Sequence, residues 1–194
     1  MFNIVLLEPE IPANTGNIGR TCLVTGSRLH LIEPMGFILN DKNLKRAGMD
    51  YWHELDVTVY DSFRDFVRRN YHNIDFAQAI LKDSNLAGLD AEKGSGEAEN
   101  DKARLWMATT KGLKTHDQAQ FRDGDYIMFG KESAGIPEDI LMTSKDECIR
   151  IPMAPGQRSL NLSNSVAVVL YEALRQNDYL ELELKGQLHN NSWN

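Results

Sequence analysis

Hydrophobic residues along the chain form short continuous runs, separated by longer stretches in which apolar and polar residues mix. Runs rich in valine, isoleucine, leucine and aromatic residues predict strands that are buried on both faces of a sheet. In the mixed stretches, apolar residues recur three and four positions apart, which predicts helices with one buried face. We expect strands at residues 3–7, 28–32, 55–60, 104–110, 126–129 and 148–153, and helices at about 15–25, at 41–46, from Phe63 onward, from Pro137 onward and at 160–177.

Strands that alternate with helices predict an α/β fold with a mostly parallel sheet and helices on both faces. The segment at about residues 73–102 breaks this alternation, because it is poor in aromatic residues and rich in glycine, serine and acidic residues. Between Lys82 and Asp101 it carries six acidic residues and two lysines. We therefore predict a single domain over residues 1–194, with an acidic and flexible surface insertion at about 73–102.

The composition is that of a globular protein, with 42% hydrophobic and 25% charged residues among 194. No apolar run approaches the roughly 18–20 residues that span a bilayer, and the N-terminus lacks the basic region of a signal peptide. Cys22 and Cys148 lie far apart, in a predicted helix and a predicted strand, so we expect reduced thiols in the core. These features favour a cytoplasmic protein with no membrane segment.

The net charge of −7 argues at first against a nucleic-acid partner. Most of this charge comes from the insertion and from the acidic tail at residues 178–185, so the rest of the chain is close to neutral. Basic residues cluster at Lys42–Arg46 and at Arg64–Arg69. Each cluster fits either a solvated helix face or part of an RNA-binding surface, and the charge pattern alone leaves both readings open.

Polar and glycine-rich segments follow several of the predicted strands. Ligands of open α/β sheets bind beyond the carboxyl ends of the strands, so these segments are the candidate site. Some of their residues also fit plain structural roles: Gly130 ends a strand, and Ser159 or Asn161 suits a helix N-cap. The segments are Glu8–Arg20, Thr109–Lys114, Gly130–Pro137 and Pro152–Asn164.

The first of these segments stands where a dinucleotide-binding fold places its phosphate loop. Its glycines do not keep the G-x-G-x-x-G spacing, since only Gly16 and Gly19 form a G-x-x-G pair. If a helix starts near Thr15, then Asn14, Asn17 and Arg20 follow one another at i, i+3 and i+6 along its first turns. Amide side chains beside a helix N-terminus suit an anionic or polyhydroxylic ligand.

Other chemistries find little support in the sequence. The five histidines are dispersed and form no H-x-x-x-H pair or Cys/His cluster, so we expect no metal site. The chain also lacks a G-x-S-x-G nucleophile elbow and a Walker loop.

Six motifs, in order along the chain, resemble the SPOUT class of methyltransferases. They are EPEIPANTGNIGR, HLIEPMGF, KRAGMDY, ATTKG, DGDYIMFGKESAGIP and IRIPM followed by RSLNLSNSVAVVLYEA. Within that class the chain is most similar to the small tRNA (cytidine/uridine-2′-O-)methyltransferases that modify the wobble nucleotide. The resemblance implies a C-terminal deep trefoil knot, S-adenosylmethionine as cofactor, the tRNA anticodon stem-loop as substrate and a homodimer with the site near its interface.

The resemblance also implies roles for individual residues. Arg20 and Asn14 match the catalytic motif, and Asn17, Lys45 and Arg46 would contact the substrate. Tyr171 matches a helix tyrosine of the last motif and is assigned to the substrate side, as a dimer contact or a core residue. The implied cofactor contacts are Ala108, Thr109, Gly130, Glu132, Ile151, Met153, Ser159, Leu160 and Asn164.

The implied reaction is in-line attack of a ribose 2′-OH on the methyl carbon of a sulfonium, which needs positioning and proton removal but no metal. In the family proposal the motif arginine, here Arg20, is the base. Guanidinium groups stay protonated in proteins, so Arg20 could instead hold a phosphate and orient the hydroxyl. The usual family Glu-Thr-Arg-Gly reads Glu132-Ser133-Ala134-Gly135 here. The missing arginine leaves open an inactive RNA-binding dimer, and a nicotinamide-dependent oxidoreductase is a third, less favoured reading.

Overall fold

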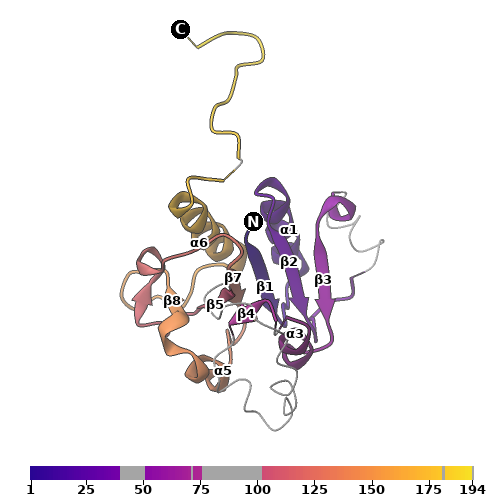
Figure 1. Ribbon diagram of the computed structural model, residues 1–194, viewed down its shortest axis with the longest axis vertical. Coiled ribbons are helices and arrows are strands. Elements are labelled where there is room, and N and C mark those ends of the chain that lie inside the picture. Colours follow the sequence, from indigo (N-terminus) through magenta and orange to yellow (C-terminus); the bar gives the residue numbers. More distant parts are fainter. Residues whose placement is uncertain (40–50, 71, 76–101, 181, 194) are drawn as a thin grey trace.

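The computed structural model describes residues 1–39, 51–70, 72–75, 102–180 and 182–193. Strands and helices alternate over most of this range, as the hydrophobic pattern predicts (Figure 1). The strands are β1 (Asn3–Leu7), β2 (Arg28–Ile32), β3 (Val57–Tyr60), β4 (Ile74–Asp75), β5 (Ala103–Ala108), β6 (Lys114–Thr115), β7 (Tyr126–Phe129) and β8 (Cys148–Arg150). The α-helices are α1 (Pro12–Val24), α3 (Phe63–Asn70), α5 (Glu138–Thr143) and α6 (Leu162–Gln176), and 3-10 turns lie at Trp52–Glu54, His116–Gln118 and Lys145–Glu147.

The strands of the described residues belong to one sheet, in the order β3-β2-β1-β7-β5-β8-β6, with β4 paired to the start of β5. Every strand pair in this sheet is parallel. The prediction of a mostly parallel α/β sheet is therefore confirmed. Because the strands are parallel, the loops that follow β1, β5, β7 and β8 all emerge at the same edge of the sheet, beside one another.

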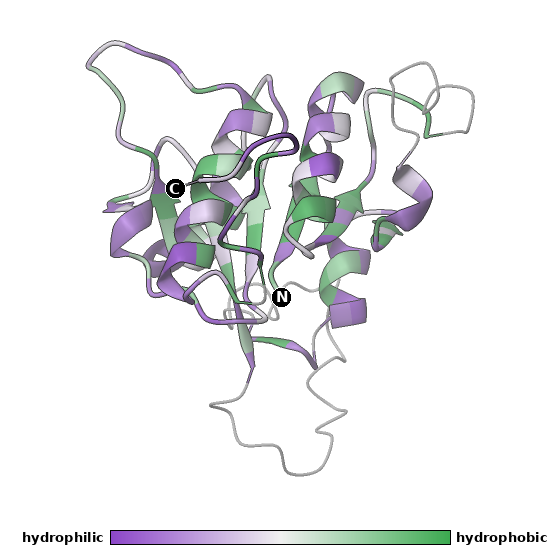
Figure 2. Ribbon diagram, turned by 90° about the horizontal axis from the view of Figure 1, so that it is seen from above, coloured by the Kyte–Doolittle hydropathy of each residue, from purple (hydrophilic) through white to green (hydrophobic). Residues whose placement is uncertain are grey.

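Two hydrophobic cores lie on the two faces of the sheet. Successive side chains of a strand point to opposite faces, so Ile4 and Leu6 of β1 face the core that holds α1 and α6. Val5 and Leu7 face the second core, which includes Phe66 of α3. Figure 2 shows the strands as largely hydrophobic, whereas the helices carry bands of both kinds. Helices thus cover both faces, as predicted.

Strand β8 lies between β5 and β6 in the sheet, although it follows both in the sequence. The chain that joins β5 to β6 therefore passes the end of β8, and it does so at very close range. A Cβ on Gly112 would lie 2.8 Å from the carbonyl carbon of Ile149, and Thr109 N–H donates to the Ile149 carbonyl at 2.8 Å. Glycine is required where two backbones approach this closely.

Several element boundaries differ from the sequence prediction. Helix α1 begins at Pro12 rather than near Thr15, because proline is well suited to the first helical turn. Strand β8 ends at Arg150, shortly before Pro152, which lacks the N–H that a ladder needs. Ile74, which the sequence assigns to the insertion, is buried in β4. The helix predicted at 41–46 and residues 76–101 of the predicted insertion lie outside the described residues.

Both cysteines are free and buried, as predicted. Among the residues that the structure describes, no helix is both long and apolar enough to cross a membrane.

A buried histidine joins three strands through side-chain hydrogen bonds. Asn3 of β1 donates its amide to the Gly124 carbonyl at 2.9 Å, so its Oδ1 is the acceptor for His30 Nε2 at 3.2 Å. Nε2 therefore carries the proton, and Nδ1 accepts from the Tyr60 hydroxyl at 2.9 Å. Tyr60 in turn accepts from Asn70 at 3.2 Å. This network specifies a neutral imidazole between β1, β2 and β3.

We expect the stability of the protein to fall as pH drops from about 6.5 towards 4. Burial lowers the pKa of His30 from 6.5 to about 4, so the unfolded chain binds this proton first. The contribution of neutral His30 to the free energy of unfolding is fully present above pH 6.5 and is lost as the pH falls to 4. At 1.36 kcal/mol per pKa unit, it amounts to roughly 3 kcal/mol. Urea unfolding at stepped pH measures it, and His30→Gln should flatten the curve in this window. An unchanged slope in that variant would assign the pH effect to other groups.

Candidate active site

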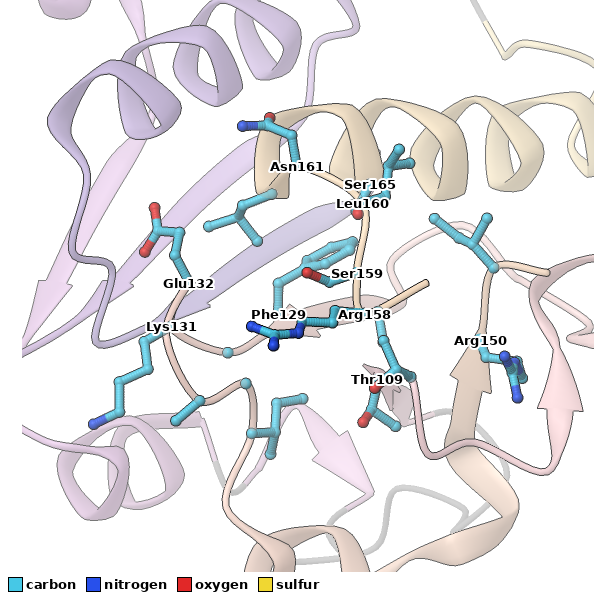
Figure 3. Close-up of a pocket in the computed structure, with 18 of the residues that line it drawn as sticks. Thr109, Phe129, Lys131, Glu132, Arg150, Arg158, Ser159, Leu160, Asn161 and Ser165 are labelled. Atoms are coloured by element: carbon cyan, nitrogen blue, oxygen red, sulfur yellow. The ribbon is translucent and has the colours of Figure 1, made fainter. Parts of the chain in front are cut away.

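A cavity of about 590 Å³ opens at the carboxyl ends of β5, β7 and β8 (Figure 3). Its volume is within the range of roughly 300–1,000 Å³ that small-molecule sites occupy. The loops after β5, β7 and β8 supply most of its walls, and Ile11, Asn14 and three residues of α6 (Leu162, Ser165 and Val169) complete it. The structure brings together in its lining eight of the nine cofactor residues predicted from the sequence, namely Ala108, Thr109, Gly130, Glu132, Ile151, Met153, Ser159 and Leu160.

The turn after β7 is closed by direct contact between its own backbone segments. Lys131 and Gly135 form an antiparallel bridge, in which Gly135 N–H donates to the Lys131 carbonyl at 2.8 Å. A Cβ on Gly130 would lie 2.0 Å from the Gly135 carbonyl carbon and 2.2 Å from Ile136 N. Gly135 has φ +72°, which favours glycine. The floor of the cavity therefore depends on two glycines.

Gly130→Ala is expected to weaken binding of S-adenosylmethionine, the cofactor that the sequence motifs imply, at least tenfold. It should also destabilise the fold by about 1–3 kcal/mol, because the new methyl group forces the turn open. Isothermal titration and thermal unfolding measure the two effects. Gly186→Ala is a matched control, since a Cβ there meets no atom within 4 Å. Normal cofactor affinity in Gly130→Ala would show that the closed turn is not needed for the site.

The Glu132 carboxylate ties the loop after β7 to the loop after β1. Its Oε2 accepts from Glu10 N–H at 2.8 Å, and its Oε1 accepts from Ile11 N–H at 3.3 Å and from the Asn14 amide at 2.9 Å. Glu132 is therefore occupied with protein donors, on the first-loop side of the cavity in Figure 3. Because both carboxylate oxygens already accept hydrogen bonds from the protein, the position of Glu132 favours a role in shaping the cavity over direct binding of a ligand.

Glu10 makes the reciprocal connection. Its carboxylate accepts from Ser133 N–H at 2.9 Å and from the Ser133 hydroxyl at 2.8 Å. These bonds lower the pKa of Glu10 below its ordinary value. Lys131 adds an ion pair to Glu8 at 2.7 Å, which raises the pKa of the lysine. Residues 8–14 and 131–133 thus hold one another through charge-assisted hydrogen bonds.

Asn161 links the N-terminus of α6 to α1. Its Oδ1 accepts from Ser163 N–H at 3.0 Å and from Asn164 N–H at 3.3 Å, which is the N-cap of α6. Its amide donates to Asn14 Oδ1 at 3.1 Å, so Glu132, Asn14 and Asn161 form one chain of hydrogen bonds. The sequence marked Asn161 only as a possible cap, because its second partner lies 147 positions away.

Four residues that the sequence assigned to the site do not line this cavity: Asn17, Arg20, Asn164 and Tyr171. Asn164 lies in the first turn of α6 and is exposed, and its backbone N–H donates to the Asn161 cap. Tyr171 is 46% exposed, which excludes the core alternative. Lys45 and Arg46 lie outside the described residues.

Asn14, Asn17 and Arg20 turn out to point in different directions. A helix advances about 100° per residue, so each step of three falls about 60° short of a full turn. Asn14 is buried beside Glu132, whereas Asn17 and Arg20 are exposed. The Arg20 guanidinium lies 4.5 Å from the centroid of the Tyr51 ring, and Tyr51 donates to the Gly16 carbonyl at 2.5 Å. The prediction that Asn14 and Arg20 lie on one face of the helix is therefore wrong.

The cavity also contains charged residues that the sequence did not single out as ligands. They are Lys111, Lys131, Arg150 and Arg158. Only the folded sheet brings these positions together, since they come from the end of β8 and from the loops after β5, β7 and β8. Within the described part of the chain, no group of three or more His, Cys, Asp and Glu residues could hold a metal ion.

A parallel α/β sheet with a cavity at the carboxyl ends of its strands is the arrangement in which open α/β proteins bind small-molecule ligands. The SpoU rRNA Methylase family matches residues 1–171, and the chain belongs to this family. The chain is 47% identical over 180 residues to the tRNA (cytidine(34)-2′-O)-methyltransferase of Escherichia coli K12, covering 92% of this chain and 96% of that one. It is 43% identical over 177 residues to the enzyme of the same name from Saccharophagus degradans, covering 91% and 96%.

Solved structures agree with this assignment. A structure solved to explain 2′-OH methylation of C/U34 on tRNA is 36% identical to this chain, with a TM-score of 0.72 over 92% of this chain and 97% of the other. The SpoU methyltransferase AviRb from Streptomyces viridochromogenes, solved with AdoMet, is 20% identical and has a TM-score of 0.67 over 91% and 60%. At that identity the second likeness concerns the fold alone. The resemblance to wobble-modifying methyltransferases drawn from the sequence motifs is thus confirmed.

Proposed function

We propose that the protein uses S-adenosylmethionine to methylate the ribose 2′-OH of the wobble nucleotide of tRNA, cytidine or uridine 34. The observation that carries this proposal is 47% identity, over 92% of the chain, to a relative named for that reaction. The identity covers almost the whole chain, and the cavity is built from motifs that run from Ile11 to Val169. An inactive RNA-binding protein has no comparable support.

The residues that line the cavity support S-adenosylmethionine as the cofactor. Phe129, Ile149, Ile151 and Leu160 provide apolar surface for an adenine ring, and the bent backbone after β5, β7 and β8 provides polar partners at its edges. When bound, the cofactor supplies an electrophilic methyl group on a sulfonium. The task of the protein is then to bind it, to exclude water and to orient the attacking hydroxyl.

The cavity would lie in a deep trefoil knot. Support comes from the place of β8 between β5 and β6, and from the contact of Gly112 with the Ile149 backbone. After β8 the chain returns through residues 151–161 to α6. Helix α6 packs in the same core as α1, on one face of the sheet. In this arrangement the loop after β5 encloses the C-terminal part of the chain.

Arg20 and Asn14 would position the acceptor ribose, with Asn17, Lys45 and Arg46 contacting the surrounding RNA. Asn14 reaches the cavity of its own chain, but Arg20 does not. In a homodimer, the second copy of the chain would bring its own Arg20 to this cavity. Exposed apolar side chains on α1 and α6 support such an interface: Val24, Val168 and Tyr171 are 60%, 40% and 46% exposed.

Isothermal titration tests the cofactor assignment directly. The protein should bind S-adenosylmethionine and show no heat with NAD, because the first loop lacks the dinucleotide glycine pattern. Binding of NAD alone would support the oxidoreductase reading instead. The substrate assignment requires a methyl-transfer assay with tRNA.

A further inference from the structure

Basic side chains outnumber acidic ones in the lining of the cavity, although the whole protein carries a net charge of −7. Among the described residues, four basic side chains line it, from Lys111, Lys131, Arg150 and Arg158, and Glu132 is the one acid. Two of the four are already paired, since Lys131 binds Glu8 at 2.7 Å and Lys111 binds Glu138 at 2.8 Å. The two arginines are different, because neither forms a side-chain hydrogen bond or ion pair with any described residue.

Arg158 stands directly after a rigid turn. Ala154, Pro155, Gly156 and Gln157 form a β-turn in which Gln157 N–H donates to the Ala154 carbonyl at 3.3 Å. Proline at the second position and a glycine with φ +81° at the third are the signature of a type II turn. In Figure 3 the Arg158 side chain extends over the cavity towards the loop of Lys131 and Glu132, while Arg150 lies beyond Thr109 in that view.

The proposed cofactor does not account for two free arginines. S-adenosylmethionine carries a sulfonium, an ammonium and a single carboxylate, so its net charge is positive. A cationic ligand gains nothing from additional unpaired cations in its cavity. An RNA strand, in contrast, carries one negative phosphate per nucleotide, and the planar fork of arginine binds phosphate oxygens in pairs.

We propose that Arg158, together with Arg150, binds backbone phosphates of the RNA next to the ribose that is methylated. The proposal rests on the proposed function and adds a phosphate subsite at the rim of the cavity. Asn161, three positions after Arg158, contacts Asn14, so the same loop connects the subsite to the start of α1. Binding of the phosphates would thereby fix the ribose relative to the cofactor.

The test compares tRNA and cofactor binding in Arg158→Ala, Arg158→Lys, Arg150→Ala and a matched control. The control is Arg122→Ala, which removes one exposed arginine at the opposite edge of the sheet, before β7, and changes the net charge equally. Dissociation constants for unmodified tRNA are measured by fluorescence anisotropy at several salt concentrations, with S-adenosylhomocysteine present. Titration with S-adenosylmethionine and thermal unfolding are measured for every variant.

Arg158→Ala is expected to weaken tRNA binding roughly tenfold, the order of one charge-assisted contact. The slope of log affinity against log salt should fall by about 0.7, the value per single-strand phosphate. Arg150→Ala should act in the same direction, Arg158→Lys should retain part of the affinity, and Arg122→Ala should match the wild type. The affinity for S-adenosylmethionine should stay within about twofold in each.

Three results would overturn the proposal. Weaker binding of S-adenosylmethionine with unchanged tRNA affinity would make Arg158 a ligand of the cofactor carboxylate. An equal loss of tRNA affinity in Arg122→Ala would show that only the overall charge matters. No loss of tRNA affinity in Arg158→Ala would show that Arg158 does not bind the RNA. If the wild type itself neither binds nor methylates tRNA, the proposed function fails; if it does and Arg158→Ala is unaffected, only the phosphate subsite fails.

Discussion

Arg20→Ala is expected to lower methyl transfer by roughly 10²–10⁴-fold, the range for loss of a group that acts on the reacting proton or orients its carrier. S-adenosylmethionine affinity should change little, because Arg20 does not line the cavity of its own chain. The fold should also remain intact, since the guanidinium is exposed and its contact with the Tyr51 ring lies at the surface of α1. Single-turnover transfer to tRNA and isothermal titration of the same preparation measure both quantities.

Mixing two inactive variants shows from which chain Arg20 acts. Arg20→Ala protomers keep an intact cavity, and Glu132→Ala protomers keep an intact Arg20. If the arginine serves the cavity of its partner, random exchange makes half of the dimers mixed, each with one complete site, and activity returns to about a quarter of the wild-type value. Full activity in Arg20→Ala alone, or no recovery in the mixture, would remove Arg20 from this role.

Glu132→Ala should reduce activity at least 100-fold, because it breaks the connection between the two loops of the site. The carboxylate accepts from Glu10 N–H, Ile11 N–H and Asn14. Removing it leaves these donors without their acceptor, at a cost of about 1–3 kcal/mol for each that stays buried. Asn14 loses its fixed direction at the same time, and kcat is expected to fall more than cofactor affinity.

Glu132→Gln separates the charge and geometry of this side chain from its volume. One of the two oxygens becomes an NH₂ group, which then faces an N–H donor, so the isosteric variant should be nearly as impaired as Glu132→Ala. Ser133→Ala is the control, since the Ser133 hydroxyl supplies only one of the two bonds to Glu10. Wild-type turnover in Glu132→Gln would show that the loops hold together without this carboxylate.

The architecture was largely predictable, because a buried parallel sheet leaves a strong pattern in the sequence. The runs at 3–7, 28–32 and 126–129 coincide with β1, β2 and β7. The two-residue strands β4 and β6 were not predicted, since such short segments carry no periodicity and depend on pairing with β5 and β8. Helix α1 starts at Pro12 because proline suits the first turn of a helix. The spacing of Asn14, Asn17 and Arg20, from which the start near Thr15 was predicted, did not indicate this.

The site was predictable in its loops but not in the direction of its side chains. Motifs located eight of the nine proposed cofactor residues at the cavity, whereas Asn164 and Arg20 point elsewhere. Three site residues were not predicted as ligands: Asn161, Arg150 and Arg158. Their roles depend on a long-range contact or on a shared cavity, and both arise only in the folded chain. Helix phase and long-range contacts of this kind are set by tertiary packing, which spacing along one segment does not encode.

The central claim is methylation of the ribose 2′-OH at position 34 of tRNA, and mapping the product tests it most directly. The protein is incubated with unmodified tRNA and S-adenosylmethionine labelled in its methyl group, and the methylated nucleotide is located by nuclease digestion and mass spectrometry. We expect one labelled methyl group, on the 2′-oxygen of cytidine or uridine 34, the position named in the closely similar enzymes. Absence of label, or a methyl group on a base or at another nucleotide, would contradict the account.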